Sequence, residues 1–291
     1  MTVAVMICGH GSRDTQAVDE FNRLAGLLRP RFPDYDVDSG FLEFARPVIR
    51  DGLEALKSRG AKHIVMLPGM LFAARHVKND LPSEANAFAA DNPDIEVTLA
   101  RDLGIEPKLL TAAAERITEA APRGDLSDTL LVVVGRGTND SDANSNVSKV
   151  ARMLWEGMGF GWAEAAYSGV ADPLVDAALE RAVAMGFGRI IVFPYFMFTG
   201  ILVQRIYAWV DEVQARHPDI EFIKAGYFND HPLLIDCFVD RVAEVFTGDN
   251  AMNCQLCKYR EQIIGYEDEV GAPQQGHHHH VRGIGTGHSH G

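Results

Sequence analysis

His10, Glu43 and His76 are the residues of this 291-residue chain whose types and positions could do chemistry. Each of them follows a predicted strand. His10 comes after the apolar run that begins at Val3, Glu43 closes the weakly alternating segment Asp36–Glu43, and His76 comes after the buried run Ile64–Leu67. The carboxyl ends of parallel strands line the ligand crevice of an open sheet. We therefore expect these three side chains to meet at one edge of a sheet.

Two imidazoles and one carboxylate form a ligand set that suits Co²⁺, Ni²⁺, Fe²⁺ or Zn²⁺. The same groups are effective general bases near neutral pH. No four-ligand spacing of a closed structural zinc site is visible in this half of the chain. Ser12 lies beside His10 but lacks the Gly-x-Ser-x-Gly elbow of a hydrolase. These residues predict a site that holds a metal ion loosely and exchanges protons.

The elements around these residues follow an α/β pattern. The first strand runs into a Gly-His-Gly-Ser turn, and Thr15–Leu28 then has apolar residues at helical spacing. A strand, a glycine turn and a helix open a βαβ unit. The later predicted elements are a helix from Pro47, the strand Ile64–Leu67, the segment Arg75–Pro82, a helix over Ser83–Ala90, the strand Ile95–Leu99 and a closing helix over Glu106–Ala120. They complete a four-stranded, doubly wound domain.

The pattern then repeats with a constant offset of 126 residues. Gly9-His10-Gly11 corresponds to Gly135-Arg136-Gly137, and the offset also carries Phe41 onto Tyr167, Pro47 onto Pro173, Gly60 onto Gly186 and Pro68 onto Pro194. We predict two tandem homologous α/β domains, flavodoxin- or Rossmann-like, with parallel four-stranded sheets and a central cleft. The expected boundaries are 1–123 and 127–248, with a mostly irregular tail over 249–291.

The second half keeps the structural glycines and prolines but loses the reactive side chains. The replacements are His10 by Arg136, Glu43 by Gly169, His76 by Leu202, Lys78 by Gln204 and Asp80 by Ile206. The first half is therefore expected to carry the site. Arg136 would remain useful as a fixed positive charge for an anionic ligand.

The formal net charge of −13 argues against a nucleic-acid partner, which needs clustered Lys and Arg. The most apolar run, Ile190–Val203, contains a proline and a glycine and is too short to span a bilayer. The start of the chain has no basic, apolar signal segment. We expect a cytoplasmic protein with no membrane partner.

The tail contains two further candidate metal-binding motifs. Cys254 and Cys257 form a Cys-x-x-Cys pair, whose spacing lets two thiolates reach one metal or cluster, although a redox dithiol has the same spacing. A histidine tract in a glycine-rich setting follows, and we interpret it as metal-gathering: His277, His278, His279, His280, His288 and His290.

The motifs together resemble one known family. They are Gly9-His10-Gly11-Ser12-Arg13, then Phe41-Leu42-Glu43 with Pro47 soon after, and Leu67-Pro68 followed by Arg75–Pro82. The chain is similar to the class II tetrapyrrole chelatases, and within them to the long cobaltochelatases that fuse two halves and add a Cys- and His-containing tail. The resemblance implies that His10, His76 and Glu43 bind the metal and manage the pyrrole protons. It also implies an iron–sulfur cluster at Cys254 and Cys257.

The activity that the resemblance implies is the insertion of Co²⁺, as substrate, into sirohydrochlorin for cobalamin synthesis. Because sirohydrochlorin carries many carboxylates, basic strand-end residues are expected to bind it. The candidates for substrate binding are Ser12, Arg13, Arg46, Arg75, Lys78 and Arg136. Two alternatives stay open, a non-enzymatic Co²⁺ or Ni²⁺ carrier and a ferrochelatase of the sirohaem branch. The protein would be a monomer or a homodimer.

Overall fold

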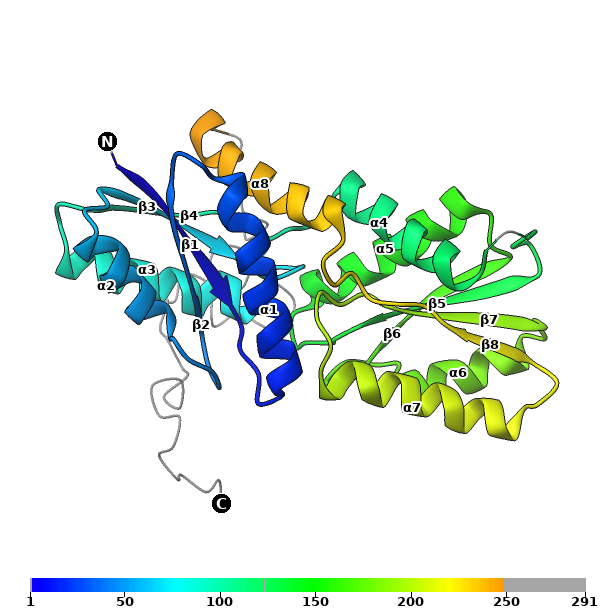
Figure 1. Cartoon of the computed structure of the whole chain (residues 1–291). Helices are drawn as coiled ribbons and strands as arrows, with labels where there is room; N and C mark the ends of the chain where they lie inside the picture. The colour runs from blue at the N-terminus through cyan, green and yellow to red at the C-terminus, as the bar shows by residue number, and fades with distance from the viewer. Residues whose placement is uncertain (1, 123, 249–291) are drawn as a thin grey trace, which may run out of the picture. The chain divides into compact units, whose positions relative to one another are not determined.

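The computed structural model describes residues 2–122 and 124–248 and contains two parallel four-stranded sheets. Their strand orders are β2-β1-β3-β4 and β6-β5-β7-β8, and each sheet is flanked by helices (Figure 1). The predicted α/β fold with two homologous parallel sheets is confirmed. Within the described residues, no helix is both long and apolar enough to cross a membrane.

The first half of the chain forms the elements that carry His10, Glu43 and His76. In chain order they are β1 (Val3–Gly9), α1 (Thr15–Leu28), a 3₁₀ turn (Arg29–Arg31), β2 (Asp36–Phe41), α2 (Ile49–Ser58), β3 (His63–Pro68), a π-helical turn (His76–Asp80), α3 (Leu81–Asp91), β4 (Glu96–Leu99) and α4 (Pro107–Ala120).

The second half repeats this order of strands and α-helices without the 3₁₀ and π-helical turns. Its elements are β5 (Thr129–Gly135), α5 (Ser141–Met158), β6 (Trp162–Tyr167), α6 (Val175–Ala184), β7 (Arg189–Pro194), α7 (Ile201–Arg216), β8 (Glu221–Lys224) and α8 (Pro232–Thr247). The matching order is what the offset of the sequence motifs predicts.

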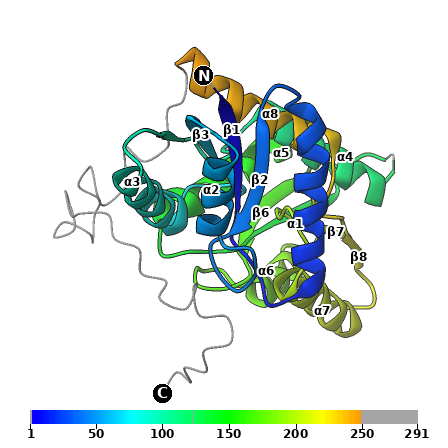
Figure 2. The ribbon, with the colours of Figure 1, turned by 60° about the vertical axis from the view of Figure 1, so that its left-hand side comes forward.

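Strand β1 is the centre of the first sheet and is buried on both faces. Its Ala4, Met6 and Cys8 side chains pack with α2 and α3 in one apolar cluster. Val5 and Ile7 point to the opposite face, because successive side chains of a strand alternate. Figure 2 shows α2 and α3 on one side of this sheet and α1 and α8 on the other. Both faces are covered, which explains why the β1 sequence is a continuous apolar run rather than an alternating one.

The structure divides into two compact units that differ from the two sequence halves. One unit comprises the described part of Met1–Gly104 and Ile235–Gly291, and the other comprises Ile105–Leu234. The closing helices are therefore exchanged: α4 packs in the second unit and nearly all of α8 in the first. We propose that 1–123 and 127–248 are the duplicated halves. The last helix of each half then packs in the folded unit that consists mainly of the other half.

Named contacts hold each exchanged helix in its unit. On α4, Arg116 donates to the Phe228 carbonyl oxygen at 2.8 Å, and Glu115 contacts His231 at 2.9 Å. On α8, the buried Arg241 donates to the Leu103 carbonyl oxygen at 3.2 Å, and Glu244 accepts from Arg101 at 2.9 Å. Buried charges need such partners, because a lone buried charge is strongly destabilising.

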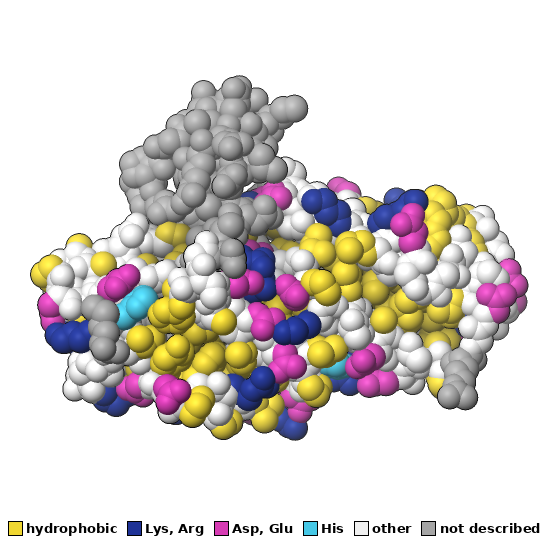
Figure 3. Space-filling model, turned by 90° about the horizontal axis from the view of Figure 1, so that it is seen from above, with side chains coloured by type: hydrophobic (Ala, Val, Ile, Leu, Met, Phe, Trp, Pro, Cys, Tyr) yellow, Lys and Arg dark blue, Asp and Glu magenta, His cyan; other side chains and the backbone are white. Residues whose placement is uncertain are grey.

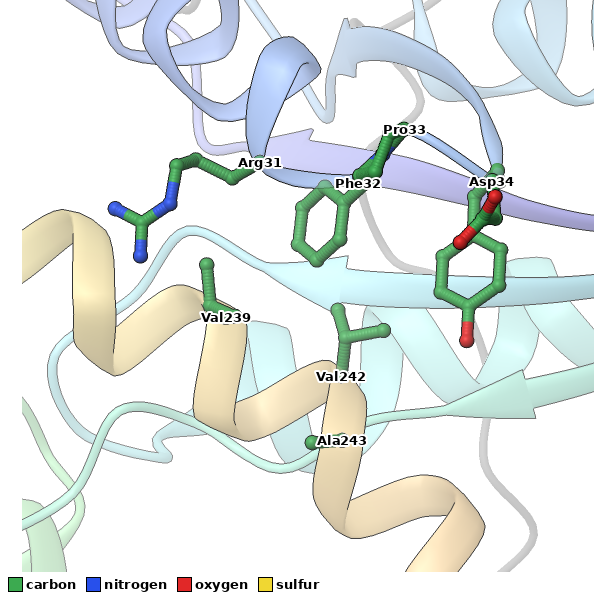
Figure 4. A pocket seen from close by; sticks show the side chains of 8 residues that line it. Arg31, Phe32, Pro33, Asp34, Val239, Val242 and Ala243 are labelled. Atoms are coloured by element: carbon green, nitrogen blue, oxygen red, sulfur yellow. The ribbon is translucent and has the colours of Figure 1, made fainter.

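A shallow hollow marks where α8 crosses the segment that follows α1. Its volume is about 230 Å³, and Phe32, Pro33, Val239 and Val242 are among the residues that line it (Figure 4). The lining from the first half precedes β2, so the hollow belongs to the amino-terminal end of that strand. His10, Glu43 and His76 follow strands and are separate from it.

The segment Arg75–Pro82 differs from the sequence-based expectation, which started the helix at Ser83. Helical structure begins at His76 as a π-helical turn and continues directly into α3 at Leu81. Pro82 has no backbone N–H to donate to the preceding turn, and the turn before it is the wider π-helical form rather than regular α-helix. The early start places His76 and Asp80 on one helical turn.

Candidate metal centre

His10, Glu43 and His76 come together at the carboxyl edge of the first sheet, as the sequence predicts. Each offers one ligand atom, and these atoms all lie within 4.8 Å of one another. They form the only such group of three or more His, Cys, Asp or Glu residues among those that the structure describes. We call these three side chains, which could hold a metal ion, the cluster.

The register of β1 explains why the cluster forms. Strand β1 pairs in parallel with both β2 and β3, with Gly9 opposite Phe41 and Cys8 opposite Pro68. All three strands therefore end at the same level. His10 directly follows β1, while Glu43 and His76 lie further along the connections that follow β2 and β3.

Backbone hydrogen bonds extend the β1–β2 pairing past the ends of the strands. Leu42 donates to the Gly9 carbonyl oxygen at 2.8 Å, and Glu43 donates to that of His10 at 2.9 Å. Gly11 adopts a φ of +95°, and a Cβ added there would lie 1.6 Å from the Glu43 carbonyl oxygen. A residue without a side chain is therefore required at position 11. The close approach of the two backbone segments fixes the spacing between His10 and Glu43.

The two imidazoles face each other through their Nε2 atoms. His10 Nε2 lies 3.0 Å from His76 Nε2 and 3.3 Å from Glu43 Oε1. His10 Nδ1 contacts the Gly11 carbonyl oxygen at 2.9 Å, and His76 Nδ1 contacts Asp80 Oδ2 at 2.8 Å. Because these oxygens accept hydrogen bonds, we assign the ring hydrogen of each neutral histidine to Nδ1. Both Nε2 lone pairs then converge, an arrangement that a metal ion or a shared proton stabilises.

The cluster is a nitrogen and oxygen site without sulfur. Cys8 lies two residues before His10, but it is buried in the sheet and donates to the Met6 carbonyl oxygen at 3.3 Å. Burial raises the pKa of the Cys8 thiol far above its usual value, and the nearby Glu84 carboxylate adds to the effect. The thiolate, which is the metal-binding form, is therefore disfavoured at this position.

Among the predicted substrate-binding residues, the arginines are exposed, whereas Ser12 and Lys78 are not. Arg13, Arg46 and Arg75 are exposed and lie in the connections that follow β1, β2 and β3. Arg136 is also exposed, but it belongs to the second unit, after β5. Among the described residues of the face drawn in Figure 3, basic side chains are interspersed with acidic ones.

Ser12 and Lys78 have different surroundings from the four exposed arginines. The Ser12 hydroxyl accepts the Asp14 amide at 3.0 Å and shapes the turn that leads into α1. Lys78 is 2% exposed and lies inside the π-helical turn rather than in an open loop. This burial differs from the exposed loop position that the sequence indicates for Lys78, and the early helix start is its cause.

Three residues that contact the cluster or the connection leading to His76 were given no site role from the sequence, although Asp80 was counted there among the reactive side chains that the second half lacks. Phe44 adopts a positive φ of 62°, and its ring lies 6.4 Å from the His10 ring and 5.0 Å from the Arg13 guanidinium carbon. Asp80 contacts His76, as described above. Asp102 follows β4 and accepts the Ala73 amide at 2.9 Å, which restrains the connection that leads to His76. The one available sequence signal was the four-residue spacing of His76 and Asp80. That spacing indicates a contact only where a helix is expected.

The predicted tail sites lie outside the described residues and remain predictions. They are Cys254, Cys257, His277, His278, His279, His280, His288 and His290.

The fold and the cluster together define a duplicated α/β protein with a candidate metal centre in its first repeat. A family model described as CbiX matches the chain twice, over residues 4–120 and 130–245. The chain belongs to the CbiX family, which confirms the chelatase family that the sequence motifs indicate.

Individual relatives agree with this assignment. A sirohydrochlorin cobaltochelatase of Priestia megaterium is 33% identical over 271 residues, which cover 91% of this chain and 87% of that protein. A sirohydrochlorin ferrochelatase of the same organism is 28% identical, over 78% of this chain and 85% of that protein. The cobalt complex of the sirohydrochlorin chelatase SirB from Bacillus subtilis subspecies spizizenii superposes with a TM-score of 0.71. That pair is 27% identical, with coverage of 84% of this chain and 95% of that one.

The close approach at Gly11 generates a prediction with a matched control. Gly60 has nearly the same φ, +92°, but an added Cβ there meets nothing within 4 Å. Both Gly11→Ala and Gly60→Ala carry the left-handed backbone penalty, whereas only Gly11→Ala also displaces the Glu43 backbone. We expect Gly11→Ala to lower the free energy of unfolding by about 1–3 kcal/mol more than Gly60→Ala, measured by urea denaturation.

Gly11→Ala should also remove Co²⁺ binding at the cluster, which Gly60→Ala should retain. Titrations of the full chain, with His76→Ala as the blank for other sites, measure this binding. Equal effects of the two substitutions would show that the contact with Glu43 does not position the cluster.

Asp102 generates a prediction about pH. Burial raises the pKa of Asp102 from 3.8 to about 6, an effect only partly offset by the Ala73 amide and by Arg101 and Lys78. Between pH 4 and 6 the folded chain holds a proton that the unfolded chain has released, so this group makes the protein less stable as the pH rises. We expect the unfolding free energy of Asp102→Asn to rise by roughly 2 kcal/mol relative to that of the wild type between pH 4 and pH 7. A difference in unfolding free energy that stays constant with pH would contradict this account.

Proposed function

We propose that this protein inserts a divalent metal ion into sirohydrochlorin and that its metal substrate in the cell is Co²⁺. The observation that carries the proposal is the convergence of His10 Nε2, His76 Nε2 and a Glu43 carboxylate oxygen within 4.8 Å of one another. The relatives named above as sirohydrochlorin cobaltochelatase and ferrochelatase support the macrocycle as the second substrate.

A set of three protein ligands suits a metal substrate, which must later dissociate from the protein. Two neutral imidazoles and one carboxylate bind first-row divalent ions and leave coordination positions open. In a chelatase those positions admit the pyrrole nitrogens while the metal still contacts the protein. A closed set of four protein ligands is typical of structural sites that retain their metal.

The cluster also provides the bases that the reaction needs. Insertion of one M²⁺ ion forms bonds to four ring nitrogens and releases two N–H protons from the macrocycle. Glu43 is buried and lies 3.3 Å from His10 Nε2, so its carboxylate and the two imidazoles are close enough to pass a proton between them. As the metal moves to the macrocycle, the freed Nε2 atoms can accept protons, which favours the forward reaction.

Exposed arginines support the binding of an anionic macrocycle despite the acidic net charge. Arg13, Arg46 and Arg75 follow the same three strands as the cluster residues, so their guanidinium groups can pair with substrate carboxylates. Arg136, which corresponds to His10 in the second half, would add a further positive charge.

The choice of Co²⁺ rests on the relatives. The cobaltochelatase of Priestia megaterium matches this chain at 33% identity, against 28% for the ferrochelatase of the same organism. The ligand set itself accepts both metals. Anaerobic assays that follow sirohydrochlorin absorbance with Co²⁺, Fe²⁺ or both metals decide between them. Faster insertion of Co²⁺ supports the proposal, and faster insertion of Fe²⁺ makes the protein a ferrochelatase.

The cluster residues generate the central prediction about activity. We expect His10→Ala, His76→Ala and Glu43→Gln each to lower the insertion rate roughly 10²-fold or more, because each removes a ligand and a proton acceptor. The assay is the anaerobic absorbance change of sirohydrochlorin with Co²⁺. His217→Ala is the control, since His217 directly follows α7 and contacts Glu180 at 3.1 Å, outside the cluster.

Two outcomes would contradict parts of this account. Full turnover by His10→Ala or His76→Ala would exclude the cluster as the reaction centre. A wild-type protein that binds Co²⁺ but never changes the macrocycle spectrum would be a metal carrier rather than a chelatase.

A further inference from the structure

We propose that Asp80 is a positioning residue that fixes the tautomer of His76, so that its Nε2 lone pair faces the metal. This inference rests on the proposed role of His76 as a metal ligand. Asp80 does not belong to the cluster itself, because its carboxylate contacts the far side of the His76 ring.

The contacts of Asp80 define its role. Its Oδ2 atom lies 2.8 Å from His76 Nδ1, and its Oδ1 atom accepts from Asn79 Nδ2 at 3.0 Å. Asp80 is only 4% exposed, and Asn79 is buried as well. An ionised carboxylate only accepts hydrogen bonds, so the His76 ring must present its hydrogen at Nδ1. The Nε2 atom is then left with the lone pair that a metal needs.

The helical turn brings the two side chains together. The Leu81 amide donates to the His76 carbonyl oxygen, which is the five-residue hydrogen bond of a π-helical turn. His76 and Asp80 are four residues apart on this turn and therefore lie on one face. Single π-helical turns are rare and often occur at functional sites.

The second half of the chain provides an internal comparison. Position 206 corresponds to position 80, and Ile206 is fully buried in the apolar core that α7 helps to form. Leu202 corresponds to His76, and α7 is regular from Ile201 onward. The same fold thus accepts an aliphatic side chain at this position. Burying a carboxylate at position 80 costs free energy unless the carboxylate is hydrogen-bonded. The contact with His76 provides such a hydrogen bond.

The tautomer matters because of the geometry between the two histidines. His10 Nε2 and His76 Nε2 are 3.0 Å apart, and the Gly11 carbonyl oxygen accepts from His10 Nδ1 at 2.9 Å. If His76 carried its hydrogen on Nε2, that hydrogen would point at His10 Nε2 and occupy the place of the metal. Asp80 disfavours this alternative by stabilising the Nδ1–H form.

The first test determines the tautomer of His76 in the wild-type protein. Long-range ¹⁵N–¹H spectra of the full chain with ¹⁵N-labelled histidine distinguish the two ring nitrogens of His76, with His76→Ala used to assign the signals. The proposal predicts that neutral His76 carries its hydrogen on Nδ1. A predominant Nε2–H form in the wild-type protein would overturn it.

The second test uses Asp80→Asn and Asp80→Ile. An asparagine can turn its NH₂ group toward Nδ1, and isoleucine, which the second half holds at this position, offers no acceptor. We expect both variants to raise the Nε2–H fraction and to weaken Co²⁺ binding at the cluster 10- to 100-fold. Calorimetric titration with Co²⁺ alone, corrected with the His76→Ala blank, measures the affinity.

Glu115→Gln is the matched control, because Glu115 Oε2 contacts His231 Nε2 at 2.9 Å in the second unit. It alters a histidine–carboxylate contact of similar length but should leave both the tautomer of His76 and the affinity of the cluster for Co²⁺ unchanged. Unchanged Co²⁺ affinity in a folded Asp80 variant would overturn the positioning role. Loss of affinity in a protein that never metallates sirohydrochlorin would instead retain this role and reject the proposed function.

Discussion

The close approach of the Gly11 backbone to the Glu43 carbonyl group is the constraint on which the arrangement of His10, Glu43 and His76 depends. It continues the parallel pairing of β1 and β2 beyond their ends, through hydrogen bonds from Leu42 to Gly9 and from Glu43 to His10. The second half keeps the same approach, since a Cβ at Gly137 would lie 1.9 Å from the Gly169 carbonyl oxygen. Both halves therefore share this backbone arrangement, whereas only the first half carries the reactive side chains.

Within that frame, the cluster is arranged by the groups behind its ligands. The Gly11 carbonyl oxygen and the Asp80 carboxylate accept from the two Nδ1 atoms, which turns both Nε2 lone pairs toward Glu43 and toward each other. Opposed lone pairs favour a cation between them, whether a metal ion or a proton. A site of this kind can exchange one for the other, and that exchange is the chemistry that metal insertion requires.

Much of this structure could be predicted from local sequence patterns. The apolar run of β1, the helix over Thr15–Leu28 and the constant offset between halves gave the fold, and the strand ends gave the three cluster residues. The exchange of α4 and α8 could not be predicted, because helical periodicity shows that a helix has an apolar face but not which sheet covers it. The burial of Lys78 and the contact of Asp80 depend on a π-helical turn ahead of Pro82, a position that usually indicates a helix start.

The most direct test of the account is the position of Co²⁺ in crystals of the full chain, located by anomalous scattering at the cobalt absorption edge. The account predicts a cobalt peak about 2.1 Å from His10 Nε2 and His76 Nε2, with a Glu43 carboxylate oxygen at a similar distance. Peaks at other residues alone, with His10 and His76 still in direct contact, would contradict the claim that these three side chains hold the metal substrate.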